Sequence, residues 1–102
     1  MTYIKINDAL YPASIRGFVK DKEWNDRESK AITLEMSYAD AMALFVDDLH
    51  WEIVYEDSET TEVYDNAEFS VAGAVTDNRN GTVTVKMGKP TADELLAILM
   101  GG

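Results

Sequence analysis

Apolar and polar residues alternate with a period of two over seven short stretches of the chain. Such alternation is typical of strands that bury one face of a sheet. The seven stretches are 3–6, 10–20, 31–36, 51–55, 61–64, 69–75 and 82–87. Asn80-Gly81, between the last two, favours the positive backbone angles of a tight turn. The sequence therefore predicts a sheet whose most clearly marked part is a hairpin over 69–87.

The period changes after Met36, where a helical pattern replaces the alternation. Ser37 is a typical N-cap residue, and it precedes apolar residues spaced by three or four positions, namely Tyr38, Met42, Phe45 and Leu49. This spacing places them on one helical stripe. It predicts a helix over about 37–48 that packs its stripe against the sheet.

A second helix is predicted over about 91–100. Thr91 and Glu94 have the spacing of a capping box, in which each side chain accepts a hydrogen bond from the other residue's backbone N–H. The residues after them are mostly apolar, including Leu95, Leu96 and Leu99. Such a helix either plugs the end of the sheet or docks onto another chain.

The order of these elements indicates the fold class. Short connections between strands favour antiparallel pairing. We therefore expect an α+β fold that is mostly antiparallel β, with six to seven strands forming a small barrel or rolled sheet and two short helices. A length of 102 residues is that of a single domain, 1–102.

Composition removes several chemistries. The chain has no cysteine and one histidine, so thiolate sites, disulfides and sites that need two histidines are excluded. It contains no phosphate-binding glycine loop and no recognisable nucleophile–histidine motif. We therefore expect no enzyme activity, no cofactor and no metal. Nothing resembles a signal peptide or a membrane span, which predicts a cytoplasmic protein without a membrane partner.

Charge is distributed unevenly along the chain. The net charge is −10, yet residues 31–78 contain twelve Asp and Glu residues and no Lys or Arg, whereas 1–30 and 79–102 each carry +1. This acidic block repels nucleic acid and anionic lipid, so no direct nucleic-acid binding is expected. Acidity serves solubility in many small proteins. It also suits an inhibitor that presents carboxylates in place of DNA phosphates to a basic protein.

Two sets of residues are candidates for binding. The acidic surface would consist of residues from the predicted 37–48 helix and the 50–64 hairpin: Asp40, Asp47, Asp48, Glu52, Glu56, Asp57, Glu59 and Glu62. The second set is apolar, and such residues are enriched in protein interfaces. It comprises Tyr11, Phe18 and Trp24, with Leu95, Leu96 and Leu99. Trp24 is the only apolar residue of a polar loop expected over 21–30, where it either folds back onto the core or offers a contact.

The stretch from Ala67 to Leu99 resembles small uncharacterised proteins encoded among bacteriophage and prophage structural genes. The opening Tyr3-Ile-Lys-Ile-Asn and Leu10-Tyr-Pro-Ala are similar to the same proteins. The resemblance implies no catalytic residue. It implies a tail or assembly component in the cytosol of a host bacterium or in a virion. We therefore expect a non-enzymatic protein that self-associates or binds a protein partner, with the DNA mimic as the alternative.

Overall fold

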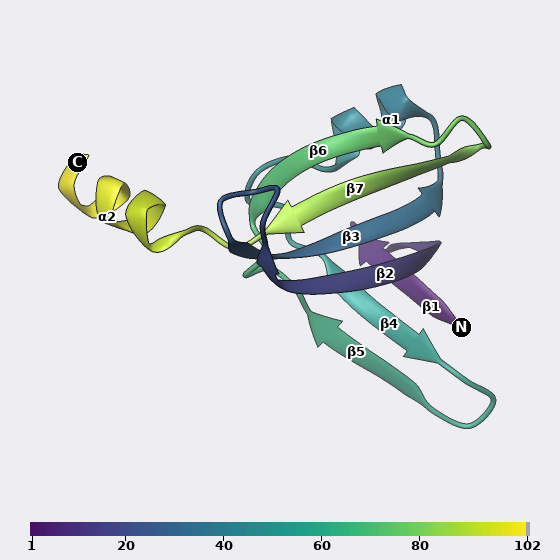
Figure 1. Cartoon of the computed structure of the whole chain (residues 1–102). Coiled ribbons are helices and arrows are strands. Elements are labelled where there is room, and N and C mark those ends of the chain that lie inside the picture. The colour runs from purple at the N-terminus through teal and green to yellow at the C-terminus, as the bar shows by residue number, and fades with distance from the viewer. Residues whose placement is uncertain (102) are drawn as a thin grey trace.

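The chain folds around one antiparallel sheet of seven strands with two helices beside it (Figure 1). A computed structural model describes residues 1–101. The strands are β1 (Thr2–Ile6), β2 (Ala9–Asp21), β3 (Arg27–Glu35), β4 (Glu52–Glu56), β5 (Thr61–Asp65), β6 (Val71–Asp77) and β7 (Thr82–Gly88). The helices are α1 (Tyr38–Leu44) and α2 (Ala92–Gly101). The α+β, mostly antiparallel class predicted from the sequence is confirmed.

The sheet does not close into a barrel. Its strand order is β5-β4-β1-β2-β3-β7-β6, so β5 and β6 are its two edges. The segment between α1 and β4 covers the β6 edge: Asp47 Oδ1 accepts a hydrogen bond from the Ala72 N–H at 2.8 Å, and the Asp48 N–H donates to the Ser70 carbonyl at 2.7 Å. A barrel would require β5 to pair with β6, and these bonds occupy backbone groups that such pairing would need. Of the two forms expected from the sequence, the barrel is therefore the wrong one.

Alternating apolar residues of β1, β3, β4 and β7 form the buried core, as the period of two predicts, and residues of β2 and β6 pack against it. Ile4, Ile32, Ile53 and Val85 come from four of these strands and are at most 2% exposed. The register places Ile15, Ile32 and Val85 side by side across β2, β3 and β7. Trp51 lies fully buried just before β4, and its indole N–H donates to the Phe69 carbonyl at 3.2 Å. The core therefore joins strands from both halves of the sheet.

Helix α1 is shorter than predicted and uses a different face. It begins after Ser37, whose hydroxyl accepts a hydrogen bond from the Asp40 N–H at 3.1 Å, but it ends at Leu44 rather than near 48. Phe45 already has an extended backbone. Ala41 and Phe45 are buried, whereas Tyr38 and Met42 of the predicted stripe are about half exposed. The small Ala41 side chain lets a two-turn helix lie close to β6 and β7.

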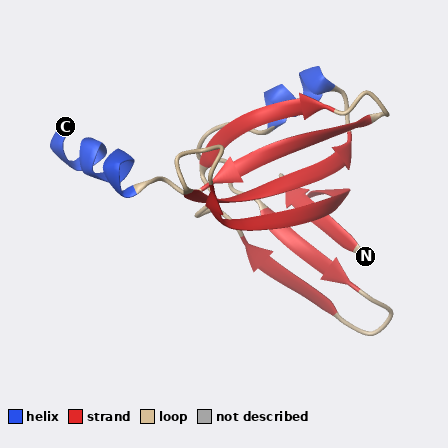
Figure 2. Cartoon of the chain, in the orientation of Figure 1, coloured by secondary structure: helices blue, strands red, loops and turns tan. Residues whose placement is uncertain are grey.

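The polar loop predicted over 21–30 is also wrong in extent. Only 22–26 is a loop, because β3 begins at Arg27 and pairs with β2 and β7. Arg27 and Ser29 are polar but buried, since other polar side chains bond to them. Figure 2 shows this loop folded over one end of the strands that it joins. Sequence polarity here combines an exposed loop with a buried polar network of Asp21, Arg27 and Ser29.

Replacing Ile32 by Ala should lower the free energy of unfolding by about 2–5 kcal/mol, because it leaves a cavity in the packed core. Ile32 is 0% exposed, whereas Val19 on β2 is 83% exposed. Val19→Ala is therefore the matched control and should change stability by less than about 0.5 kcal/mol. Urea unfolding monitored by tryptophan fluorescence measures both variants. Equal effects of the two substitutions would contradict the proposed core.

Candidate interaction surfaces

Helix α2 extends away from the sheet and exposes its apolar side chains (Figure 1). Its position close to the predicted 91–100 is confirmed. Leu95 and Leu96 are about half exposed, and Leu99 is 82% exposed. These three leucines share one helical face with Ala92, because their spacing follows the three- and four-residue repeat of an α-helix. The structure therefore leaves uncovered the apolar face that the sequence predicts as a plug or a docking element.

The start of α2 is fixed by the predicted capping box. The Thr91 hydroxyl accepts a hydrogen bond from the Glu94 N–H at 3.2 Å, and Glu94 Oε1 accepts one from the Thr91 N–H at 2.9 Å. Two N–H groups that a helix start leaves unpaired thus find partners. The bonds determine where α2 begins and how Glu94 is oriented.

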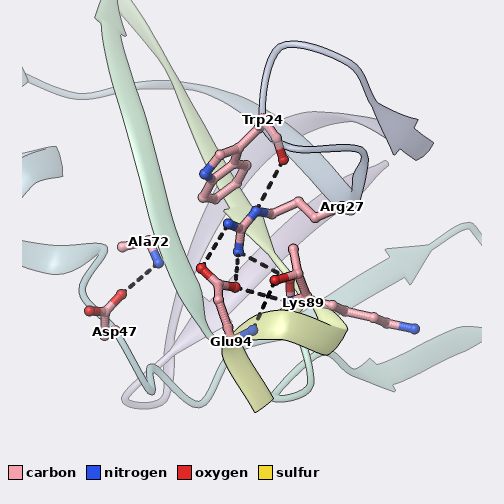
Figure 3. Close-up of polar contacts among 7 residues, drawn as sticks. Trp24, Arg27, Asp47, Ala72, Lys89 and Glu94 are labelled. Atoms are coloured by element: carbon pink, nitrogen blue, oxygen red, sulfur yellow. Dashed lines mark hydrogen bonds and ion pairs between the residues drawn. The ribbon is translucent and has the colours of Figure 1, made fainter. Parts of the chain in front are cut away.

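Arg27 connects α2 to the sheet (Figure 3). Its Nη1 and Nη2 donate to the two carboxylate oxygens of Glu94 at 2.8 and 3.0 Å, and Nη1 also donates to the Lys89 carbonyl at 3.3 Å. The Arg27 side chain is 3% exposed. A bidentate pair of this kind fixes direction as well as distance. Arg27 and the Thr91 N–H together hold the pKa of Glu94 at about 2, well below its ordinary value.

Trp24 packs against the sheet rather than pointing into solvent. Its ring lies over the Cα positions of Gly73 and Gly88, where an added methyl group would come within 3 Å of ring atoms. The Arg27 guanidinium stacks on the same ring at 4.4 Å from the centroid (Figure 3). The Trp24 carbonyl accepts a hydrogen bond from Arg27 Nε at 3.3 Å. Of the two roles left open by the sequence, the anchoring one describes this position.

The three predicted interface aromatics do not form one patch. Tyr11 lies on the face of β2 that packs against the core, next to Ala13 and Ile15. Phe18 lines a hollow on the opposite face, and Trp24 lies over β6 and β7. Alternation along β2 explains the separation of Tyr11 and Phe18, since seven positions place two residues on opposite faces.

That hollow, of about 700 Å³, is a surface that the sequence reasoning missed. It lies on the outer face of β2, β3 and β7. Its lining includes Phe18, two acids and an excess of basic residues; the acids are Asp21 and Glu23, and the bases are Arg16, Lys20, Lys22 and Lys86. Arg16 and Lys86 lie over the Phe18 ring at 5.0 and 5.5 Å from its centroid. A clue was present in the sequence: Arg16, Phe18 and Lys20 alternate along one predicted strand face.

A buried carboxylate organises one side of the hollow. Asp21 Oδ2 accepts hydrogen bonds from Lys86 Nζ and Ser29 Oγ, each at 2.9 Å, and its Oδ1 accepts one from the Glu23 N–H at 3.1 Å. These bonds lower the pKa of Asp21, and the same carboxylate raises the pKa of Lys86. Both groups stay charged near neutral pH. The other three cations of the hollow are left without this partner.

The predicted acidic surface is divided into two groups. Asp40, Asp47 and Asp48 belong to α1 and the segment after it, beside β6, whereas the β4–β5 hairpin at the other sheet edge carries Glu52, Glu56, Asp57, Glu59 and Glu62. Figure 1 shows α1 at the top of the view beside β6 and the hairpin tip at the bottom. The twelve-acid block of the sequence is therefore not a single face in space.

Two of these acids hold backbone in place. Asp47 bonds to β6 as described above (Figure 3), and Asp57 Oδ1 accepts the N–H groups of Glu59 and Thr60, both at 2.8 Å. Those N–H groups lower the pKa of Asp57. The hairpin turn is therefore built on an ionised carboxylate, and the remaining acids of the tip are exposed to solvent.

Comparison with known proteins gives no match to a family model, a curated protein or a solved structure. Within residues 1–101, no three or more His, Cys, Asp or Glu side chains are grouped so that they could hold a metal ion. No helix in the same range is long and apolar enough to cross a membrane. The surfaces described above are therefore the features from which a function is argued.

The ion pair between Arg27 and Glu94, which anchors α2 to the sheet, should weaken in acid. Because the folded-state pKa of Glu94 lies at about 2, below its ordinary value of 4.5, the anchor is at full strength above pH 4.5 and weakens as pH falls toward about 2. The Trp24 indole N–H resonance in NMR spectra should titrate with a midpoint near 2. Trp51, in the core, serves as the internal control for global unfolding.

Glu94→Gln should remove that titration, because a neutral amide cannot form the bidentate ion pair with Arg27. Asp93→Asn, at the neighbouring exposed position, should leave it unchanged. A midpoint near 4.5 in the wild-type protein would show that the pair does not form in solution.

Proposed function

We propose that this is a non-enzymatic assembly protein, a structural component of the phage or prophage type, which acts through contacts between chains in a host bacterium's cytosol or in a virion. The docking element is α2, and its partner is α2 of a second copy. The observation that carries the proposal is the exposed leucine face of a helix anchored at its first turn. The resemblance of Ala67–Leu99 to small phage proteins supports the setting.

The physical argument concerns the cost of leaving α2 uncovered. Side chains of Leu95, Leu96 and Leu99 in water forgo the free energy gained by burying apolar area. A helix of ten residues is also marginally stable when it packs on nothing. Pairing two copies of the same leucine face offsets both costs at once, through an interface that is the same on each partner.

The anchor makes such pairing more favourable. Because Arg27 and Thr91 fix the first turn, the direction of α2 relative to the sheet is set before association. Less freedom is then lost when the helix docks. A buried arginine and a capping box hold the first turn of α2 while its apolar side chains stay exposed. This arrangement is consistent with a helix that is positioned to bind another chain.

The geometry favours this role over the DNA mimic. Mimicry requires carboxylates in a continuous stripe with the spacing of phosphates. The acids of α1 lie beside the β6 edge of the sheet, and those of the β4–β5 hairpin lie at the opposite edge (Figure 1). Asp47 and Asp57 are also committed to backbone N–H groups. We therefore do not propose the mimic for this chain.

At about 1 M salt, where contacts between charges are screened, replacing Leu95 and Leu99 by Gln should convert a self-associating protein into a monomer. Glutamine is uncharged and favours helix nearly as well as leucine does, so the helix and the net charge are kept while the apolar face is lost. Sedimentation velocity over a range of protein concentrations measures the change. The association should withstand about 1 M salt, because burial of apolar surface is not screened.

The control is Val19→Gln, which removes from β2 an apolar side chain that is as exposed as Leu99. It should associate like the wild-type protein. A wild-type chain that is monomeric at every concentration, or a Val19→Gln variant that dissociates as fully as the α2 variant, would contradict the role of α2.

A further inference from the structure

Three basic residues without an acidic partner gather in one place, although acids outnumber bases two to one. Among residues 1–101, Lys5, Arg27, Lys86 and Lys89 form ion pairs with carboxylates, and Lys30 bonds to Asn66. No ion pair of this part of the chain includes Arg16, Lys20, Lys22 or Arg79. Three of these four line the hollow over β2, β3 and β7.

The hollow has the composition of a site for an anionic protein segment. Its lining includes the free cations Arg16, Lys20 and Lys22, all exposed, together with Phe18 and the bonded hydroxyls of Thr33 and Thr84, 2.9 Å apart. The two acids of the lining, Asp21 and Glu23, both pair with Lys86, so the three free cations are left in excess. The axes of β2, β3 and β7 together span about 10 Å, because neighbouring strands lie about 4.8 Å apart. That width suits a two-stranded element laid across them.

The β4–β5 hairpin has the complementary charge. Its tip exposes Glu56, Asp57, Glu59 and Glu62, with no Lys or Arg between positions 31 and 78. The turn is held by Asp57, and Tyr55 packs edge-on against Tyr64 at 5.7 Å between ring centroids. The tip is therefore a preformed acidic projection, and Figure 1 shows it extending beyond the rest of the sheet.

We propose that the hollow over β2, β3 and β7 binds the acidic β4–β5 hairpin tip of a second copy of this chain. Charge complementarity within one sequence selects this occupant. A nucleic acid strand fits less well, because its phosphates continue past three cations onto a surface whose net charge is −10. The hairpin tip is compact, so its carboxylates would lie against the three cations and not extend over the surrounding surface.

This contact joins two different surfaces of the same chain. Such head-to-tail contacts continue from copy to copy and give a ring or a filament, unlike the α2 pair, which closes on itself.

The contact between hollow and hairpin does not depend on α2, and it should be more sensitive to salt than the apolar α2 pair. At about 0.1 M salt the Debye length is about 10 Å, so acids across a molecule 47 Å long are screened while contacting pairs are not. At about 1 M the contacting pairs are weakened too.

The experiment uses the Leu95→Gln/Leu99→Gln chain, so that failure of the α2 proposal does not affect the result. Sedimentation velocity at about 0.1 M salt should show association that disappears at about 1 M. Lys20→Glu/Lys22→Glu should weaken it about tenfold or more, the effect of losing two exposed ion pairs. Glu56→Lys/Glu59→Lys should weaken it equally, and a chain carrying all four substitutions should regain association.

The hairpin substitutions separate this contact from a general charge effect. They change the net charge from −10 to −6, which reduces repulsion between copies, so a general effect would strengthen association where the proposal expects weakening. Arg79→Glu and Asp40→Lys are single reversals outside both surfaces and serve as controls that should leave the contact unchanged. The proposal is overturned by a monomer at about 0.1 M salt, by controls that act as strongly as the test variants, or by a labelled single-stranded DNA that binds the hollow in place of a second copy.

Discussion

A buried guanidinium has to find partners for its donors, and in this protein Arg27 is that group. Its charge lies 3% exposed at the start of β3, where water cannot solvate it. The carboxylate of Glu94, two carbonyl groups and the face of Trp24 supply what water would. These partners come from the loop before β3, from the segment after β7 and from α2. One side chain therefore determines how three parts of the chain meet.

The ring of Trp24 depends on a second constraint, the absence of side chains beneath it. Gly73 on β6 and Gly88 on β7 leave the space in which the ring lies, and a methyl group at either position would overlap it. With the ring in place, the guanidinium has an apolar and electron-rich surface to stack on. The two glycines, the tryptophan and the arginine thus act together to direct α2 away from the sheet.

The sequence was sufficient for the strands, the fold class and the capping box, because these follow from local patterns of side chains. The sequence-based predictions were wrong where a contact between distant residues overrode the structure that the local pattern indicates. Arg27 and Ser29 look like loop residues until Glu94 and Asp21 are placed beside them. Helix α1 ends at Leu44, and Asp47 beyond it bonds to the backbone of β6 instead of continuing the helix. The hollow was missed because the surface beneath the cations of β2, with Thr33, Thr84 and Lys86, exists only after β2, β3 and β7 pair.

The distribution of charge along the sequence also differs from its distribution in the folded protein. The acidic block is contiguous in sequence, but the sheet places α1 beside one edge and the β4–β5 hairpin at the other, so it divides in two. Arg16, Lys20 and Lys22 are close in sequence, and the same sheet brings Lys86 of β7 beside them around one hollow. The net charge of −10 therefore does not describe the local charges, because the molecule has a basic hollow on one surface and an acidic projection on another. Two surfaces of opposite sign on one chain attract over short distances even when the whole molecules repel, since salt screens distant charges more than those in contact.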